Sequence, residues 1–322
     1  MLIYSLFQTV DATVALILCV TLVLLTEHLS FEINSFVFSA QKATAGALLF
    51  FIKTGLWALL AVGGMMLGWV PGIASVLWLW VAANVLVIVA GYLIVVNVHK
   101  GRVAGPLATA TVWRAGLPFY LGTGLIALSQ YAERFLIVDL EPYASLGKYV
   151  YAWSAANTLQ ALSYAVVAVV GIPVLAKRFQ ADQQAFTLKQ LFVNKWVARS
   201  LVVSVAVAVA IYLFFNVVLD YVATSVPRPD NGILGVLIVS FALRAIGDIV
   251  WGGLIASKNS RVSLASAAIC VLVSVPVSYL LIKHYSIYGA AWGNVFAIMV
   301  QLTVIAVLTR VTGAKKAALS WA

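Results

Sequence analysis

The chain consists of long apolar stretches separated by short polar connections, and this spacing predicts membrane-spanning helices. The hydrocarbon core of a bilayer is about 30 Å thick and needs about 20 predominantly apolar residues per helix. Nine stretches are long enough: 14–40, 45–67, 72–96, 117–138, 148–172, 199–221, 232–256, 262–282 and 288–309. They lack the strict alternation of polar and apolar residues found in the strands of outer-membrane barrels, so we expect helices.

The composition excludes a soluble globular domain. Hydrophobic residues make up 64% of the 322 residues and charged residues only 9%, which predicts an all-α polytopic membrane protein. Cys19 and Cys270 lie inside apolar stretches, and His28, His99 and His284 lack the spacing of metal ligands, so we expect no disulfide and no metal site. No glycine-rich phosphate-binding loop followed by lysine is present, so nothing in the sequence supports ATP hydrolysis. We expect no cofactor, and the short outer connections lead us to expect no enzymatic activity.

The basic residues predict the orientation in the membrane, because cytoplasmic connections carry an excess of lysine and arginine. One set of alternate connections, with the C-terminal tail, holds 14 of the 20 basic residues, whereas the opposite set holds Lys148, Arg228 and Lys283. We therefore expect a cytoplasmic C-terminus. The formal charge of +10 then reflects topology, and we expect no nucleic-acid partner.

The chain contains a candidate internal repeat. In each copy a basic residue or histidine is followed by a carboxylate four residues on and by a lysine ten residues after that: HLSFEINSFVFSAQK at 28–42 and RAIGDIVWGGLIASK at 244–258. Each copy continues through an apolar stretch to a glycine–alanine turn, PGIAS at 71–75 and YGAA at 288–291. The alternative is coincidence between apolar segments of low complexity.

Repeats in the same orientation predict two lobes related by an axis along the membrane normal. The second lobe has three stretches before its copy of the repeat, and the first has none. We therefore expect a bundle whose N-terminal lobe is incomplete, with three helices, and whose C-terminal lobe has six; the alternative is a true nine-span protein. The predicted divisions are a partial lobe at 1–97, a cytoplasmic linker at 98–116, a six-helix lobe at 117–311 and a basic cytoplasmic tail at 312–322.

One long stretch, GLPFYLGTGLIALSQYAERFLIVDLEPYASLGKYVYAWSAANTL at 116–159, carries a family resemblance. It resembles the seventh and eighth helices of polysaccharide repeat-unit (Wzx-type) flippases, which belong to the multidrug/oligosaccharidyl-lipid/polysaccharide (MOP) exporter superfamily. The shared pattern is an acidic–arginine pair near the end of one helix, here Glu133 and Arg134, and a G-x-Y that opens the next, here 147–149. The family usually has aspartate in the acidic place. GIPVLAKRF at 171–179 and YGAAWGNVFA at 288–297 are similar to later parts of the family pattern.

The resemblance implies a transporter of the bacterial cytoplasmic (inner) membrane. Such a protein flips lipid-linked (undecaprenyl-diphosphate) oligosaccharide repeat units to the outer leaflet by alternating access, for O-antigen (lipopolysaccharide) or exopolysaccharide synthesis. The implied partners are the lipid-linked oligosaccharide, membrane lipids, a proton or sodium ion, and the polysaccharide polymerase machinery.

A diphosphate in a low-dielectric site requires cations, and three basic residues lie inside the apolar stretches: Lys53, Arg134 and Arg244. Arg244 is the strongest candidate for substrate binding, because a central arginine costs several kcal/mol unless it faces protein or water. Its alternative role is an intrahelical pair with Asp248 at i+4. Lys53 lies within snorkelling reach of the cytoplasmic end, and Arg134 could anchor the end of its helix at the interface.

Three carboxylates are candidates for ion coupling: Asp248 and Glu32, which occupy equivalent repeat positions, and Glu133. The alternative is simple charge neutralisation. Two other functions remain open. A multidrug or other small-molecule exporter of the same fold would favour an acidic or apolar cleft, and a membrane glycosyltransferase or glycan polymerase would need a sizeable extracytoplasmic loop, which the predicted outer connections do not provide.

Overall fold

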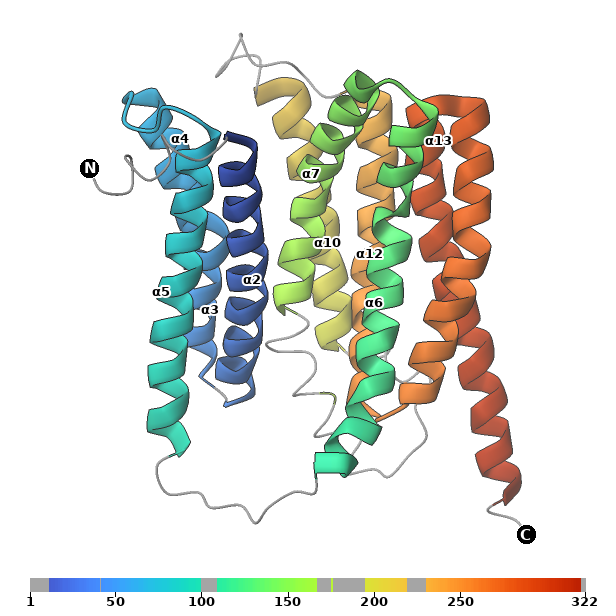
Figure 1. Cartoon of the computed structure of the whole chain (residues 1–322). Coiled ribbons are helices and arrows are strands. Elements are labelled where there is room, and N and C mark those ends of the chain that lie inside the picture. The colour runs from blue at the N-terminus through green and yellow to red at the C-terminus, as the bar shows by residue number, and fades with distance from the viewer. Residues whose placement is uncertain are drawn as a thin grey trace. The chain divides into compact units, whose positions relative to one another are not determined.

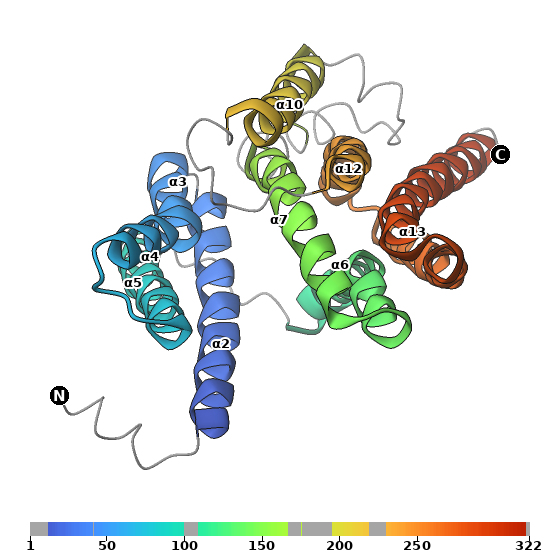
Figure 2. The same cartoon turned by 90° about the horizontal axis from the view of Figure 1, so that it is seen from above.

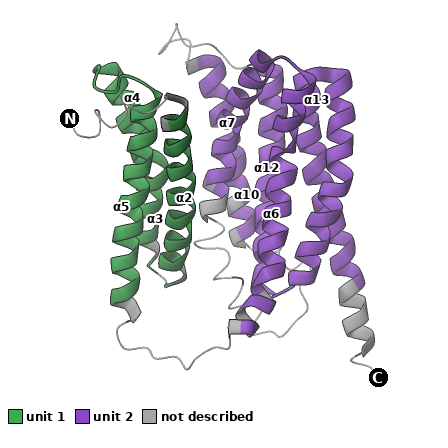
Figure 3. Cartoon of the chain, in the orientation of Figure 1, with its two compact units in different colours: residues 1–106 green, residues 107–322 purple. Residues whose placement is uncertain are grey.

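The computed structural model describes residues 12–40, 42–99, 109–166, 175, 195–218 and 230–319, and within these ranges all regular structure is helical (Figure 1). The chain divides into two compact units, residues 1–106 and 107–322 (Figure 3). Several predicted features fall outside the described residues in whole or part: the centre of the linker (100–108), the span ends 167–172 and 219–221, the motif at 171–179 apart from Leu175, and the end of the tail (320–322).

Unit 1 contains α2 (Ala12–Ser39), α3 (Ala43–Phe51), η1 (Ile52–Leu56), α4 (Trp57–Met66) and α5 (Ile73–His99). The segments α3, η1 and α4 form one continuous rod, since the residues at both junctions keep helical backbone angles. The rod ends at Gly68, whose φ of 73° allows the backbone to reverse, and the N–H of Trp69 bonds to the carbonyl of Gly64. This is a Schellman motif, in which glycine adopts the left-handed conformation without steric cost.

Unit 2 contains α6 (Thr109–Leu140), α7 (Tyr143–Val166), α10 (Lys195–Leu213), η3 (Phe214–Val218), α12 (Asn231–Ala256) and α13 (Ser260–Leu319). The last of these is two helical arms joined at Ser286, where φ is 53° and ψ is −138°. Asp230 caps α12 by accepting the backbone N–H groups of Gly232 and Ile233 at 2.9 and 3.1 Å. The Tyr288 hydroxyl donates to the same carboxylate at 2.7 Å and is the largest cause of the lowered pKa of Asp230. The start of α12 is thereby tied to the start of the second arm of α13.

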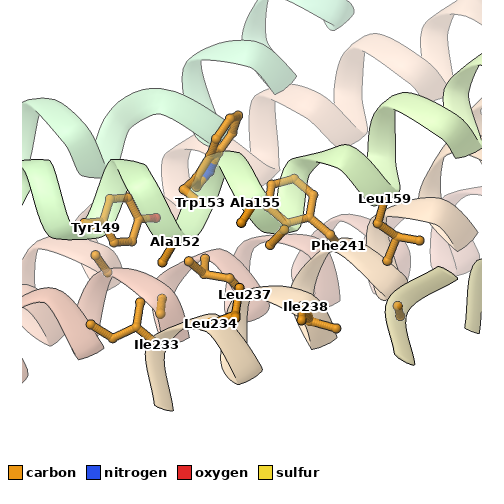
Figure 4. Packing of buried hydrophobic residues seen from close by; sticks show 14 of the residues in the cluster. Tyr149, Ala152, Trp153, Ala155, Leu159, Ile233, Leu234, Leu237, Ile238 and Phe241 are labelled. Atoms are coloured by element: carbon orange, nitrogen blue, oxygen red, sulfur yellow. The ribbon is translucent and has the colours of Figure 1, made fainter. Parts of the chain in front are cut away.

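Helix α12 is the centre of unit 2. It packs against α7, α10 and α13, as the view along the bundle shows (Figure 2), and it is the most buried of the apolar helices. Leu234, Leu237 and Phe241 of α12 interleave with Tyr149 and Trp153 of α7 (Figure 4).

Small residues let these helices approach closely. Alanines line the contact on α7 and on the second arm of α13: Ala152, Ala155, Ala156, Ala290 and Ala291. Lipid is as apolar as leucine, so helices in a membrane associate through close packing and polar contacts rather than through the hydrophobic effect. The core of unit 2 contains the small residues that such close packing requires.

The all-helical, multi-pass architecture predicted from the sequence is confirmed, in a coarser form than the predicted nine spans. Six helices in the described ranges are long and apolar enough to cross a membrane: α2, the α3–η1–α4 rod, α5, the α10–η3 rod, α12 and α13. The two arms of α13 coincide with the predicted spans 262–282 and 288–309. Helices α6 and α7 coincide with 117–138 and with most of 148–172, yet they are not among the six, because they carry more polar side chains.

The two turns that flank the first arm of α13 provide a test of orientation. Lys258 lies in the turn before this arm and is exposed, and Tyr285 is 65% exposed at the corner after it. Because lysine-rich turns stay cytoplasmic, we expect a cysteine at position 285 to react with a membrane-impermeant maleimide in whole cells. A cysteine at 258 should react only after the cells are permeabilised.

The native cysteines make the unsubstituted chain a matched control, since Cys19 and Cys270 are both buried. Labelling of the 258 variant in intact cells would reverse the assigned orientation.

Candidate functional site

Four polar side chains from four different helices meet inside unit 2. Glu133 of α6, Tyr149 of α7, Arg244 of α12 and Asn294 of α13 are all buried. The Asn294 amide Nδ2 donates to Glu133 Oε1 and, at 2.9 Å, to the Tyr149 hydroxyl oxygen, while its Oδ1 accepts from Arg244 Nη2. The Tyr149 hydroxyl donates to Glu133 Oε1 at 3.0 Å. We call these four residues the polar cluster.

The polar cluster joins a buried cation to a buried carboxylate through a neutral amide. A buried charge without a partner costs several kcal/mol, so Arg244 and Glu133 stabilise one another across Asn294. Glu133 is the carboxylate that Arg244 reaches through this amide. The ring of Phe241 adds a cation–π contact, 5.6 Å from the guanidinium carbon to the ring centroid.

The intrahelical pair considered for Arg244 and Asp248 is not formed. Across the described ranges, the ion pair found within 4.0 Å is that of Lys53 with Glu27, and the Arg244 guanidinium is turned toward Asn294. Asp248 is close enough in sequence to pair with Arg244. The arginine instead bonds to the Asn294 amide of another helix, which also bonds to the Glu133 carboxylate.

A pocket of about 180 Å³ lies next to the polar cluster. Its lining comes from α6, α7, α12 and the second arm of α13: Thr123, Ile126, Ala127, Gln130, Gln160, Arg244, Gly247, Asp248, Trp251, Ile298 and Gln301. Two of its polar atoms, Arg244 Nε and Asp248 Oδ2, are buried and have no hydrogen-bond partner among the described residues, although Gln160 is a hydrogen-bonding neighbour of the Asp248 carboxyl group.

Arg134 lies apart from the polar cluster, although it follows Glu133 in sequence. Its guanidinium carbon lies 4.0 Å from the ring centroid of Trp153 and 4.6 Å from that of Tyr131. Consecutive residues of a helix point about 100° apart, and this rotation sends the acid into the cluster and the base onto aromatic faces.

Lys53 lies in unit 1 and has its own partner. Its side chain is 4% exposed, and Nζ lies 2.8 Å from Glu27 Oε1. The other carboxylate oxygen accepts from Trp80 Nε1 at 2.9 Å, and Trp80 stacks on Trp57 with ring centroids 4.6 Å apart. Lys53 belongs to the π-helical turn η1, and such turns recur at functional sites.

Glu32 is exposed and lies in neither the polar cluster nor the pocket. In the described part of unit 1, the carboxylate that meets a buried cation is Glu27, more than one turn earlier on α2. The structure therefore gives the ion-coupling role predicted for Glu32 no supporting contact, whereas Asp248 and Glu133 lie at or beside the pocket.

Sequence reasoning missed Asn294 and the glutamines of the pocket. A pattern in the sequence could have identified them, because they are polar residues at helical spacing inside apolar stretches. Asn294 and Gln301 are seven residues apart, and Thr123 and Gln130 are also seven apart. Residues at i, i+3, i+4 and i+7 share one face of a helix. The lining residues of α12, at 244, 247, 248 and 251, follow that spacing too.

No protein-family model, no curated protein and no solved structure matches the chain. Within the described residues, no group of three or more histidine, cysteine, aspartate or glutamate side chains is placed to hold a metal ion. The functional interpretation therefore depends on the polar cluster, the pocket and the resemblance of 116–159.

The pairing of Arg244 with Glu133 can be tested by a double-mutant cycle. Arg244→Met should lower the free energy of unfolding by about 3 kcal/mol, because Glu133 is left buried without a cation. Arg244→Met combined with Glu133→Gln should recover most of this loss. The measurement is thermal unfolding of the detergent-purified protein. The matched variant, Arg244→Met with Asp248→Asn, should recover less stability. If it recovers more than the variant with Glu133→Gln, Asp248 and not Glu133 is the partner of Arg244.

The Lys53–Glu27 pair predicts a similar result in unit 1. Lys53→Met should lower the melting temperature and the amount of protein in the membrane, and Lys53→Met with Glu27→Gln should restore both, because the half-buried Glu27 carboxylate is no longer left without its cation. Glu32→Gln removes a carboxylate from the same helix at an exposed position and should change neither. A double variant as unstable as Lys53→Met would show that Glu27 is not the partner.

Proposed function

We propose that this chain is a membrane transporter that flips lipid-linked oligosaccharide repeat units across the bacterial cytoplasmic membrane. The observation that carries the proposal is a pocket between helices whose wall contains the buried Arg244 and the half-buried Asp248. Ionisable groups within membrane-spanning helices are costly and mark substrate or ion pathways. A pocket with one arginine, one aspartate and three glutamines supports transport of a large polar group.

The residues that carry the family resemblance also support this proposal. Glu133 belongs to the acidic–arginine motif and Tyr149 closes the G-x-Y motif, and their side chains are hydrogen-bonded at 3.0 Å. Two motifs that are separate in sequence thus contribute to one buried network. Arg244 and Asn294 complete that network from α12 and α13.

The proposal includes nine membrane crossings arranged as two lobes, with a cytoplasmic C-terminus. In it α6 and α7 cross the membrane despite their polar side chains, because Glu133, Tyr149 and Gln160 face the interior of unit 2. Polar residues that face protein rather than lipid do not prevent a helix from spanning.

In this proposal the buried cations bind substrate by exchanging partners. Arg244, Arg134 and Lys53 each contact protein groups: an amide, two aromatic rings and a carboxylate. A polar group of the substrate, from the diphosphate or the glycan, that reaches one of them displaces a protein partner, which couples binding to a change in helix contacts. Asp248 and Glu133 are the carboxylates placed to take up a proton or sodium ion when that exchange occurs.

A second candidate is an exporter of small molecules with the same fold. The specific observation in its favour is the carboxylate of Asp248 with Trp251 on the same pocket wall, since a carboxylate beside an aromatic ring suits an organic cation.

Replacement of the chromosomal gene by variants tests the proposal. Deletion should remove surface polysaccharide and make lipid-linked oligosaccharide accumulate in the inner leaflet. The doubly neutral variant, Arg244→Met with Glu133→Gln, should fold but lower surface polysaccharide at least about tenfold, because a charge-assisted contact worth about 1.5–3 kcal/mol is lost.

Arg261→Ala, which removes an exposed arginine at the start of α13, is the control and should leave surface polysaccharide unchanged. A deletion strain with normal polysaccharide and greater sensitivity to cationic drugs would favour the small-molecule exporter. Wild-type polysaccharide in the doubly neutral variant would leave the cluster a purely structural role.

A further inference from the structure

We infer that the pocket of unit 2 binds one uncharged sugar residue of the glycan rather than the diphosphate. This inference rests on the proposed function and adds the chemical class of the group bound at that pocket. Four features carry it: the charge balance of the wall, its hydrogen-bonding groups, its unpartnered atoms and its size.

The charge balance of the wall disfavours an anion. Among the described residues that line the pocket, Arg244 is the one basic residue, and Asp248 is on the same wall. The guanidinium is already shared with Glu133 through Asn294. A diphosphate in the pocket would meet one cation and two nearby carboxylates, and like charges in a low-dielectric site repel strongly.

The remaining polar groups match hydroxyl groups. Gln130, Gln160 and Gln301 come from three different helices, and each amide offers both donors and an acceptor. A sugar hydroxyl also donates and accepts, so vicinal hydroxyls can satisfy an amide in a paired arrangement.

Two atoms without partners among the described residues belong to lining residues on the α12 side of the same pocket: the donor Arg244 Nε and the acceptor Asp248 Oδ2. A buried polar group left unsatisfied carries the full cost of its lost hydration. If the two side chains turn toward the pocket, a hydroxyl-bearing ligand can accept from the first and donate to the second. A diphosphate has no proton to give the aspartate at neutral pH, and a metal cation cannot accept from the arginine.

The size of the pocket fits a sugar ring. A site for one water needs about 10–15 Å³ on this measure, so a pocket of about 180 Å³ holds on the order of ten water-sized groups. A pyranose ring with its hydroxyls is of that size, whereas a sodium ion fills a small part of it. Trp251 supplies an aromatic face on one wall, and small residues, Ala127 and Gly247, leave the space open; a Cβ on Gly247 would lie 2.9 Å from Ile298 Cδ1.

The test is direct binding to the detergent-purified full chain, followed by saturation-transfer NMR. The probes are the methyl glycosides of glucose, galactose and N-acetylglucosamine, with methyl glucuronide, inorganic pyrophosphate and sodium chloride as competitors. We expect saturable binding of at least one neutral glycoside and little competition by pyrophosphate.

Substitutions in the pocket locate the binding. Gln301→Leu removes an amide with little change of shape and should weaken glycoside binding about tenfold. Ala127→Phe fills the pocket and should abolish it. Leu128→Phe places the same ring one residue along α6 at a side chain that is 49% exposed and should bind as the wild type does.

A mild substitution guards against misfolding of these variants. With Cys19 and Cys270 replaced by alanine, the Ala127→Cys variant should react with a small thiol reagent, and the neutral glycoside should slow that reaction. Protection by pyrophosphate or by sodium, with none from any glycoside, would overturn the inference and favour an anion or cation site.

The outcome separates this inference from the proposed function. If the deletion strain lacks surface polysaccharide but Gln301→Leu and Ala127→Phe transport normally, the transporter stands and the sugar site fails. If glycosides bind and protect the thiol of the Ala127→Cys variant while surface polysaccharide is unaffected by deletion, the sugar site stands and the flippase assignment fails.

Discussion

The structure of unit 2 depends on the free energy of placing a charged guanidinium in a low-dielectric interior. Arg244 lies on the most buried of the apolar helices, where an unpaired charge would cost several kcal/mol. Asn294 resolves this by accepting from the arginine and donating to Glu133. The amide allows two opposite charges on different helices to share one site, and it requires α6, α7, α12 and α13 to keep one register.

The same constraint is met differently in unit 1. Lys53 contacts its carboxylate directly, at 2.8 Å from Glu27, and Trp80 binds the second carboxylate oxygen. The lysine is a compact charge that one carboxylate can satisfy, whereas the broad guanidinium needs several acceptors. Both cations are thus held by an acid from another helix, and in unit 2 this leaves Arg244 Nε and Asp248 Oδ2 beside a pocket without partners among the described residues. The candidate site is therefore the place in unit 2 where polar atoms of the buried network still lack hydrogen-bond partners among the described residues.

Because the buried charges of unit 2 need polar partners, two of its helices carry polar side chains that face the interior. α6 and α7 supply Glu133, Tyr149 and Gln160 to the interior, and these two helices are not among the six that are apolar enough to span a membrane. Packing by alanine on α7 and α13 holds the backbones close, and the hydrogen bonds then reach across short gaps. The polar cluster and the lining of the pocket come from the same helices, because polar groups in a bilayer need partners within the protein.

The sequence by itself determined the helical, membrane-spanning character of the chain, the position of most helices and the break near Ser286. The length of an apolar stretch and the polar residues that end it are local properties of the sequence. It also identified Arg244, Glu133 and Asp248 as unusual, since a charge inside an apolar stretch is visible without a fold. Only the tertiary structure decided their partners. The sequence offered Asp248, four residues from Arg244, as its partner, but Arg244 bonds to Asn294, fifty residues away. The pairing of Lys53 with Glu27 was not predicted. Helical spacing fixes which residues share a face, whereas the partner of a buried charge depends on which other helix faces it, and that is set by the packing of the whole unit.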